Sequence, residues 1–215
     1  EGIYADVGSP AAFKGGQEVL TWRGREFTSA DLAAFEFTDP GAWAVVQDGD
    51  AQVLALTRQS DYEPAVRSPK NIAWVKDIEV ADFVLEVEAR MTGELSPRAD
   101  LCFFFGYQDP THYYYAHVSV NPDENHHAVF IVNGAPRTPI TTKRNNGIVW
   151  DEAYHRIRVV RDSTSGSVKV YFDDMAETVL EAQDTTFKSG RVGVGSFHHQ
   201  GNFRVIRLFG TKPAQ

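Results

Sequence analysis

The sequence predicts an all-β fold, in which two antiparallel sheets pack as a jelly-roll sandwich with at most one or two short helices. Short runs rich in β-branched and aromatic residues follow one another, and several alternate strictly between apolar and polar residues. Glycine, proline, asparagine and aspartate separate these runs. About eleven such runs with almost no helical periodicity are typical of two packed sheets.

The chain is expected to begin with an irregular arm, because its opening segment is rich in glycine and polar residues. Residues 28–31, Thr-Ser-Ala-Asp, resemble a capping box and predict a short helix through Phe35. We assign residues 1–34 to this arm and helix, and residues 35–215 to one sandwich domain. The predicted strands are residues 43–47, 53–57, 72–75, 83–91, 101–107, 113–120, 129–133, 155–161, 168–172, 192–197 and 203–209.

The turns between these strands contain residues that tolerate a positive φ. Asp48-Gly49 and Asn133-Gly134 favour tight hairpins. A Thr-Ser-Gly segment at 164–166 separates two alternating runs, which makes them the clearest predicted hairpin. Prolines fall between runs, where a missing N–H costs nothing, at positions 40, 64, 69, 110, 122, 136 and 139.

Composition excludes several classes of function. The 215 residues are 42% hydrophobic and 23% charged, which is typical of a globular domain and excludes disorder. No apolar run approaches the ~18 residues of a membrane span. The net charge of −8 argues against a nucleic-acid groove. Cys102 is the only cysteine, so a disulfide framework is impossible, and a buried, inert thiol is the favoured interpretation.

The most informative strand contains a row of aromatic residues. Alternation directs Tyr114, Ala116 and Val118 into the core, and turns Tyr113, Tyr115 and His117 to the opposite face. Rings on a sheet face suit the C–H side of a sugar, and a histidine can also move a proton near neutral pH. The alternative is ordinary cross-strand packing of aromatic residues on a half-exposed sheet.

A second polar face lies on residues 83–91. Glu86, Glu88 and Arg90 share one side of that strand, so the two carboxylates are a candidate acid and base pair for glycoside hydrolysis. A solvated face of mixed charge is the alternative interpretation.

Other polar residues give weaker indications. Arg67, Lys70 and Lys76 flank residues 72–75 and are candidates for neutralising a carboxylate or an oxyanion, although most surface cations do neither. The adjacent pairs 126–127 and 198–199 are histidines, but neighbours in a strand point to opposite faces, so neither pair can chelate one metal ion by itself. One histidine of each pair could meet another across the sheet, with Asp or Glu completing a site, although loop positions without a ligand role are favoured. No spacing matches a zinc motif, so no metal ligand is assigned. A structural calcium ion is an open possibility through the turn aspartates Asp39, Asp61, Asp109 and Asp123.

Two stretches carry a family resemblance. Residues 82–90, Asp-Phe-Val-Leu-Glu-Val-Glu-Ala-Arg, resemble the aspartate-phenylalanine…arginine strand of the 3-keto-disaccharide hydrolase domain family, also called the family 16-like glycoside hydrolase domain. Residues 195–207 are similar to its closing strand, and residues from about 35 to 210 fit the order of the wider concanavalin-like lectin and glucanase group. The resemblance implies a concanavalin- or laminin G-like jelly roll with a concave glycan face, in exported bacterial proteins. By position, Glu88 and Arg90 would lie on that face.

Together these observations predict a carbohydrate-active protein that binds an oligo- or polysaccharide. The leading hypothesis is cleavage of a glycosidic bond by proton abstraction and elimination. His117 is then the base, Tyr115 the acid or partner base, and Arg90 or Arg67 the neutraliser of the developing enolate. Substrate contacts are assigned to Tyr113, Glu88, Glu86, His127, Asn133 and Lys76.

The main alternative is a non-catalytic, lectin-like carbohydrate-binding module, and a third is a structural domain of a cell-surface assembly. The chain starts at Glu1 without a methionine, as a trimmed chain or one that has lost a signal peptide would. We expect a secreted or periplasmic monomer with no membrane span and no nucleic-acid partner.

Overall fold

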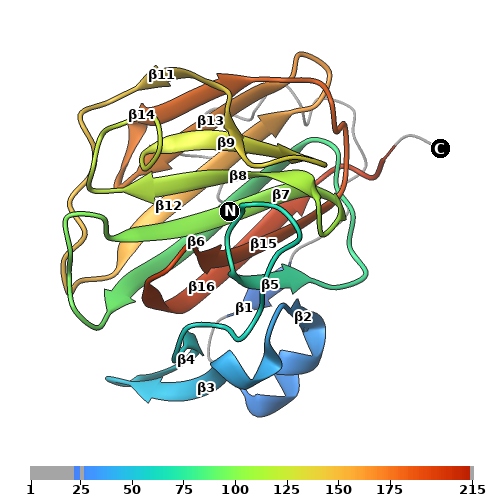
Figure 1. The fold of residues 1–215 in the computed structure, drawn as a ribbon. Helices are drawn as coiled ribbons and strands as arrows, with labels where there is room; N and C mark the ends of the chain where they lie inside the picture. The colour runs from blue at the N-terminus through green and yellow to red at the C-terminus, as the bar shows by residue number, and fades with distance from the viewer. Residues whose placement is uncertain (1–21, 25–26, 214–215) are drawn as a thin grey trace.

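The computed structural model describes residues 22–24 and 27–213, which fold as two antiparallel sheets stacked face to face (Figure 1). Most of the predicted arm, residues 1–21 and 25–26, lies outside the described residues. The described strands form a nine-stranded sheet, here called the large sheet, and a seven-stranded sheet, the small sheet. No described helix is long and apolar enough to cross a membrane.

The large sheet has the order β11-β14-β13-β12-β6-β16-β4-β3, and β1 also pairs with β16. Its strands are β1 (Trp22–Gly24), β3 (Trp43–Asp48), β4 (Ala51–Leu56), β6 (Phe83–Thr92), β11 (Thr141–Arg144), β12 (His155–Asp162), β13 (Ser167–Phe172), β14 (Asp174–Gln183) and β16 (Gln200–Gly210).

The small sheet has the order β10-β9-β8-β7-β15-β5-β2. Its strands are β2 (Phe35–Phe37), β5 (Asn71–Val75), β7 (Asp100–Asp109), β8 (His112–Ser119), β9 (Ala128–Asn133), β10 (Thr138–Pro139) and β15 (Arg191–Ser196). Neighbours such as β7 and β15 are distant in sequence, as expected of a jelly roll.

The main core lies between the two sheets and follows the alternation of the strands. On β6 the residues Leu85 and Val87 face it, and on β8 Tyr114, Ala116 and Val118 do so, as the sequence predicts. These side chains are at most 1% exposed. Burying an aliphatic side chain of this size contributes about 1.5–3 kcal/mol, so the alternation is enough to fix which face of each strand turns inward.

The predicted fold class is confirmed: the chain is an all-β sandwich with two short 3-10 helices among its described residues, η3 (Ser29–Ala34) and η4 (Pro40–Ala42). The predicted capping box opens η3, because Asp31 Oδ2 accepts hydrogen bonds from the Thr28 backbone N–H at 2.6 Å and from its hydroxyl at 2.8 Å. The predicted hairpin of residues 155–161 and 168–172 is the β12–β13 pair.

Every run predicted as a strand overlaps an observed one, but β1, β2, β10, β11 and β14 were not predicted. The longest of these is β14, whose sequence is rich in alanine and glutamate and does not alternate. Its pairing with β13 is irregular at two places, so no period of two residues can develop there. Pro139, expected in a turn, lies in β10 at the edge of the small sheet, where a proline is tolerated.

Candidate functional site

The outer face of the small sheet carries a layer of aromatic side chains. Here we call Trp74, Phe104, Tyr107, Tyr113, Tyr115 and Phe130 the aromatic layer. Strand pairing places one row straight across the sheet, in the order Glu36, Trp74, Gly193, Phe104, Tyr115 and Phe130. Four aromatic residues from four strands therefore lie in one line, with a carboxylate at the edge strand.

Gly193 explains how this row closes into one cluster. It lies on β15 between Trp74 of β5 and Phe104 of β7, whose strands are about 9–10 Å apart because one strand separates them. The two ring centres nevertheless lie 5.4 Å apart in an edge-to-face arrangement. The absence of a side chain at Gly193 lets the flanking rings meet above β15.

Tyr107 joins the layer through an irregularity in β7. Phe105 faces the main core, so strict alternation would turn Tyr107 inward as well. Gly106 has a φ of 64°, and the pairing of β7 shifts register on both sides at this point. The bulge turns Tyr107 outward, where its ring centre lies 4.2 Å from that of Trp74.

Part of the aromatic layer lines a pocket of about 200 Å³. The rings of Trp74, Tyr107 and Tyr113 form one part of its wall, and Tyr62 adds another ring from the segment before β5. The other lining residues are Glu36, Phe37, Thr38, Ile72 and Pro110. This is an apolar, aromatic pocket with a few polar groups at its border, the usual composition of a small-molecule site.

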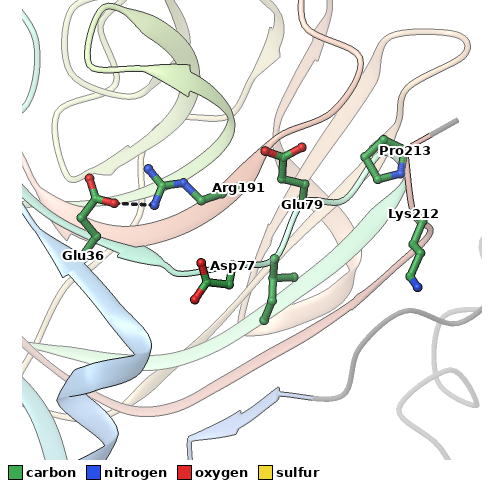
Figure 2. A pocket seen from close by; sticks show the side chains of 7 residues that line it. Glu36, Asp77, Glu79, Arg191, Lys212 and Pro213 are labelled. Carbon is green, nitrogen blue, oxygen red and sulfur yellow. Dashed lines mark hydrogen bonds and ion pairs between the residues drawn. The ribbon is translucent and has the colours of Figure 1, made fainter. Parts of the chain in front are cut away.

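A polar hollow of about 770 Å³ adjoins this pocket and shares Glu36 with it. Figure 2 shows Glu36 and Lys212 at opposite ends of the hollow, with Asp77 and Glu79 between them. Arg191 stands at the junction: its Nη1 donates to Glu36 Oε2 at 2.7 Å, and its guanidinium lies 4.3 Å from the ring centre of Tyr107.

Burial keeps the two tyrosines at the junction neutral. Burial raises the pKa of Tyr107, and Arg191 only partly opposes this effect. Burial also raises the pKa of Tyr62. Both phenols therefore remain hydrogen-bond donors at neutral pH, beside an ion pair that offers donors and acceptors to a polar ligand.

The predicted row of Tyr113, Tyr115 and His117 lies on the expected face, but under cover. Tyr113 is 1% exposed and contributes to the pocket wall. Tyr115 is fully buried, and burial raises the pKa of its phenol well above the ordinary value. His117 is 3% exposed and, like Tyr115, lines neither of these two hollows.

Arg137 covers this end of the aromatic layer. Its guanidinium lies 4.3 Å from the ring centre of Phe130 and 4.5 Å from that of Phe197, and Nη1 donates to the Tyr115 hydroxyl at 2.9 Å. The Arg137 backbone N–H donates to the Arg67 carbonyl at 3.0 Å. Arg67 is exposed, and its backbone lies next to that of Arg137 in the covering segments.

The remaining predicted contacts on this side of the molecule are dispersed. Asn133 is exposed at the end of β9, and Lys76 is half-buried after β5. His127 is fully buried and held by two hydrogen bonds: its Nδ1 accepts from the Ser119 N–H at 3.1 Å, and its Nε2 lies 3.0 Å from Asn145 Oδ1. None of the three lines the aromatic pocket or the polar hollow.

Glu86, Glu88 and Arg90 lie on the outer face of the large sheet, on the side of the sandwich away from the aromatic layer. Leu85 and Val87 of β6 face the main core. Because side chains alternate along a strand, Glu86, Glu88 and Arg90 point to the outer face. The structure therefore does not bring them together with His117. Each is committed to an ion pair: Glu86 with Arg158 and Arg156, Glu88 with Arg204, and Arg90 with Asp48.

The aspartates considered for calcium are engaged locally. Asp39 accepts from two backbone N–H groups and pairs with Arg58, and Asp109 and Asp123 each pair with the histidine three residues later. The four do not form one cluster. Among the described residues, only Asp100, Cys102 and His117 bring three possible metal-ligating atoms together.

Sequence reasoning missed Tyr62, Trp74, Tyr107, Glu36 and Arg191. The outward position of Trp74 could have been predicted from the sequence, because Trp74 alternates with Ala73 and Val75, which face the core. Tyr107 was hidden by the bulge at Gly106. Glu36 and Arg191 are 155 residues apart, so only the strand order of the small sheet reveals that they pair.

Solved structures resemble this fold closely enough to place it. A Bacillus subtilis protein of unknown function with a galectin-like fold superposes with a TM-score of 0.60 at 11% identity, covering 92% of this chain and 100% of the other. The carbohydrate-binding module CBM66 from Bacillus subtilis superposes with a TM-score of 0.57 at 14% identity, covering 81% of this chain and 94% of the module. Lectin I-B4 from Griffonia simplicifolia superposes with a TM-score of 0.54 at 14% identity, covering 88% of this chain and 98% of the lectin.

These likenesses show a lectin-like jelly-roll sandwich fold, which is consistent with the broader part of the sequence resemblance. The narrower resemblance to the 3-keto-disaccharide hydrolase family is not confirmed. No protein-family model matches the sequence, and no curated protein matches it. At sequence identities of 11–14%, the solved structures indicate the fold of this chain but not its function.

Proposed function

We propose that this protein is a non-catalytic glycan-binding module whose sugar site is the aromatic pocket together with the polar hollow. The observation that carries the proposal is the junction of the two. Tyr107 and Trp74 form an aromatic wall, and the Arg191–Glu36 ion pair stands at its border. Two structural neighbours, the carbohydrate-binding module CBM66 and lectin I-B4, support the same class of ligand.

The chemistry of a sugar matches the two parts of this site. The C–H face of a pyranose or furanose ring is apolar and packs on aromatic rings, while its hydroxyls need donors and acceptors in fixed positions. In this arrangement Arg191 donates to hydroxyl oxygens, and Glu36 accepts from hydroxyl protons. Because the hollow extends to Lys212, the site has room for more than one sugar unit.

The elimination mechanism predicted from the sequence receives no comparable support. Its base and acid, His117 and Tyr115, are both buried, and Arg137 covers the Tyr115 hydroxyl. Its candidate neutraliser Arg90 lies on the other sheet. Binding needs no tuned base and therefore fits the pocket better. We also propose that the protein works outside the cytoplasm, where structural polysaccharides are found.

The test is a glycan panel that scores both retention and new reducing or unsaturated ends. We expect saturable binding to at least one glycan, without turnover. Replacing Tyr107 by alanine should weaken that binding by about tenfold or more, which corresponds to ~1.4 kcal/mol. Absence of binding across the panel, or turnover of any bound glycan, would contradict the proposal.

Tyr154→Ala is the matched control. Tyr154 is also half-buried, and Arg204 stacks over it at 4.3 Å, the same separation as Arg191 from Tyr107. It lies beside Asp48 and the outer face of the large sheet, away from the pocket. We expect this variant to retain glycan affinity. Equal losses in both variants would place the sugar elsewhere.

A further inference from the structure

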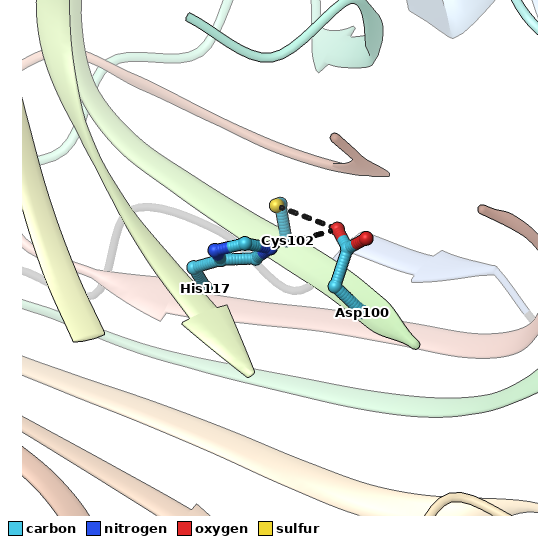
Figure 3. Close-up of side chains that lie close together, drawn as sticks. All are labelled: Asp100, Cys102 and His117. Carbon is cyan, nitrogen blue, oxygen red and sulfur yellow. Dashed lines mark hydrogen bonds and ion pairs between the residues drawn. The ribbon is translucent and has the colours of Figure 1, made fainter. Parts of the chain in front are cut away.

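The side chains of Asp100, Cys102 and His117 converge on the outer face of the small sheet (Figure 3). Asp100 and Cys102 are two residues apart on β7, so alternation places both on one face, and Cys102 pairs directly with His117 across the β7–β8 ladder. Their possible ligand atoms all lie within 4.8 Å of one another. All three side chains are buried: Asp100 is 2% exposed, Cys102 0% and His117 3%.

His117 is the unusual member of this cluster. Its Nε2 faces Asp100 and lies 3.0 Å from Oδ2, whereas its Nδ1 makes no hydrogen bond with any described residue. Two of the possible ligand atoms, Nε2 and Asp100 Oδ2, therefore already face each other.

We propose that Asp100, Cys102 and His117 bind a zinc ion through Oδ2, Sγ and Nε2. Carboxylate oxygen, thiolate sulfur and imidazole nitrogen are the three donor types that zinc takes in proteins. One carboxylate and one thiolate balance the two charges of the ion, so the buried site is neutral as a whole. Binding releases the thiol proton of Cys102 to solvent, and two metal–ligand bonds replace the direct contact between His117 Nε2 and Asp100 Oδ2.

The surroundings of Asp100 are those of an oriented ligand. Its Oδ1 accepts from His199 Nδ1 at 2.7 Å, and its Oδ2 accepts from the Phe197 backbone N–H at 2.7 Å. Hydrogen bonds of this kind hold a ligating carboxylate in one orientation. His199 is the more accessible neighbour, with 19% of its side chain exposed. We assign His199 to positioning Asp100.

Cobalt(II) titration of the full chain, after chelator treatment, tests this site directly. Cys102 is the only cysteine, so a sulfur-to-cobalt charge-transfer band in the near ultraviolet can arise from no other residue. We expect a band that saturates at one cobalt per chain and disappears when zinc displaces the cobalt. Absence of the band, or cobalt uptake without saturation, would overturn the proposal, and neither result bears on glycan binding.

Variants then assign the ligands. Cys102→Ser should abolish the band, His117→Gln should weaken cobalt affinity by at least about a hundredfold, and His199→Gln by about ten- to a hundredfold. The control is His126→Gln, because the His126 ring lies 6.4 Å from that of His117 but is partly exposed and bound to Asp123. It should leave the affinity unchanged. A band of full strength in His117→Gln would overturn the assignment.

A last measurement does not depend on how any variant folds. Zinc bound to the wild-type chain should slow the alkylation of Cys102 in mild denaturant and raise the melting temperature. Unchanged alkylation in the presence of zinc would overturn the proposal.

Discussion

Gly193 lies directly opposite Trp74 in the β15–β5 ladder, and the indole occupies space that any side chain at Gly193 would need. A Cβ atom at this glycine would lie 2.7 Å from the Ala73 carbonyl oxygen and 3.1 Å from Cε3 of the indole. The aromatic layer and its pocket therefore depend on a residue that contributes no contact of its own.

We predict that Gly193→Val destabilises the fold by about 1–3 kcal/mol, the usual cost of overpacking, and displaces the indole of Trp74. Chemical denaturation gives the change in free energy, and near-ultraviolet circular dichroism reports the displaced ring. Gly49→Ala is the control, because a Cβ at this turn meets nothing within 4 Å and only the positive φ is strained. A wild-type aromatic spectrum in Gly193→Val would show that the layer does not need the glycine.

Arg191→Ala should weaken glycan binding with little effect on stability. The guanidinium stacks on Tyr107 and pairs with a Glu36 side chain that is 52% exposed, so its net contribution to folding is about 1 kcal/mol or less. The hydrogen bonds that it would offer to sugar hydroxyls have no substitute in the variant. Isothermal titration with the glycan found in the panel measures the loss, which we expect to reach about tenfold.

Arg204→Ala is the counterpart on the large sheet. Arg204 stacks on Tyr154 at the same 4.3 Å and pairs with Glu88, so the two substitutions remove the same kinds of contact. We expect similar small changes in stability and no change in glycan affinity. Loss of affinity in Arg204→Ala alone would move the site to the large sheet.

The sequence was sufficient for the fold wherever the alternation was regular. Tyr113, Tyr114 and Tyr115 are adjacent and almost identical in chemistry, yet the pleat of one strand places Tyr114 in the main core and the other two on the outer face. That outcome was predictable, because a one-residue slip would bury His117 in the main core. The same reasoning failed at Gly106, where a single positive φ reverses the pattern for Tyr107.

The site was harder to predict than the fold, because a strand pattern does not show what covers a face. Tyr115 is turned outward as expected, but Arg137, 22 residues later, lies over it. The polar face of β6 was recognised, although the alternation alone could not tell on which sheet it would lie. Strand order, which depends on contacts between distant segments, placed Glu86 on the large sheet and Trp74 on the small one.

Glu86→Gln should be among the most damaging single substitutions on the outer face of the large sheet. Arg158 is fully buried and its Nε donates to Glu86 Oε1 at 2.6 Å, so the substitution leaves a buried guanidinium without its counter-charge. Breaking a buried pair in this way costs about 3–5 kcal/mol. Urea denaturation measures the loss.

Glu88→Gln provides the comparison on the same strand. Its side chain is 32% exposed and pairs with Arg204, which is 41% exposed, so we expect a loss of less than about 1 kcal/mol. Equal losses at the two positions would mean that burial does not set the strength of these ion pairs.

His127 should make the fold less stable in mild acid. Burial lowers its pKa to about 4, and the nearby charges of His117 and Arg144 act in the same direction. The hydrogen bond from the Ser119 N–H acts in the same direction, because Nδ1 accepts it and cannot also carry a proton, whereas the hydrogen bonds to Asn145 and Val179 partly oppose the lowering of the pKa. The unfolded chain binds a proton near the ordinary value of 6.5, whereas the folded chain does so only near 4. The neutral His127 therefore makes its full contribution to the free energy of unfolding above pH ~6.5. This contribution is lost as the pH falls toward ~4, by at most about 3 kcal/mol.

Urea denaturation between about pH 7 and pH 4.5 measures this effect in the wild type and in His127→Asn, whose amide oxygen can still accept from the Ser119 N–H. Asparagine does not titrate, so the variant should lack this part of the pH dependence. The stability advantage of the wild type over the variant should then shrink steadily as the solution is acidified. Parallel curves for the two proteins, or a His127 imidazole that titrates near its ordinary value by NMR, would contradict the prediction, since the buried ring would then accept a proton without unfolding the strands around it.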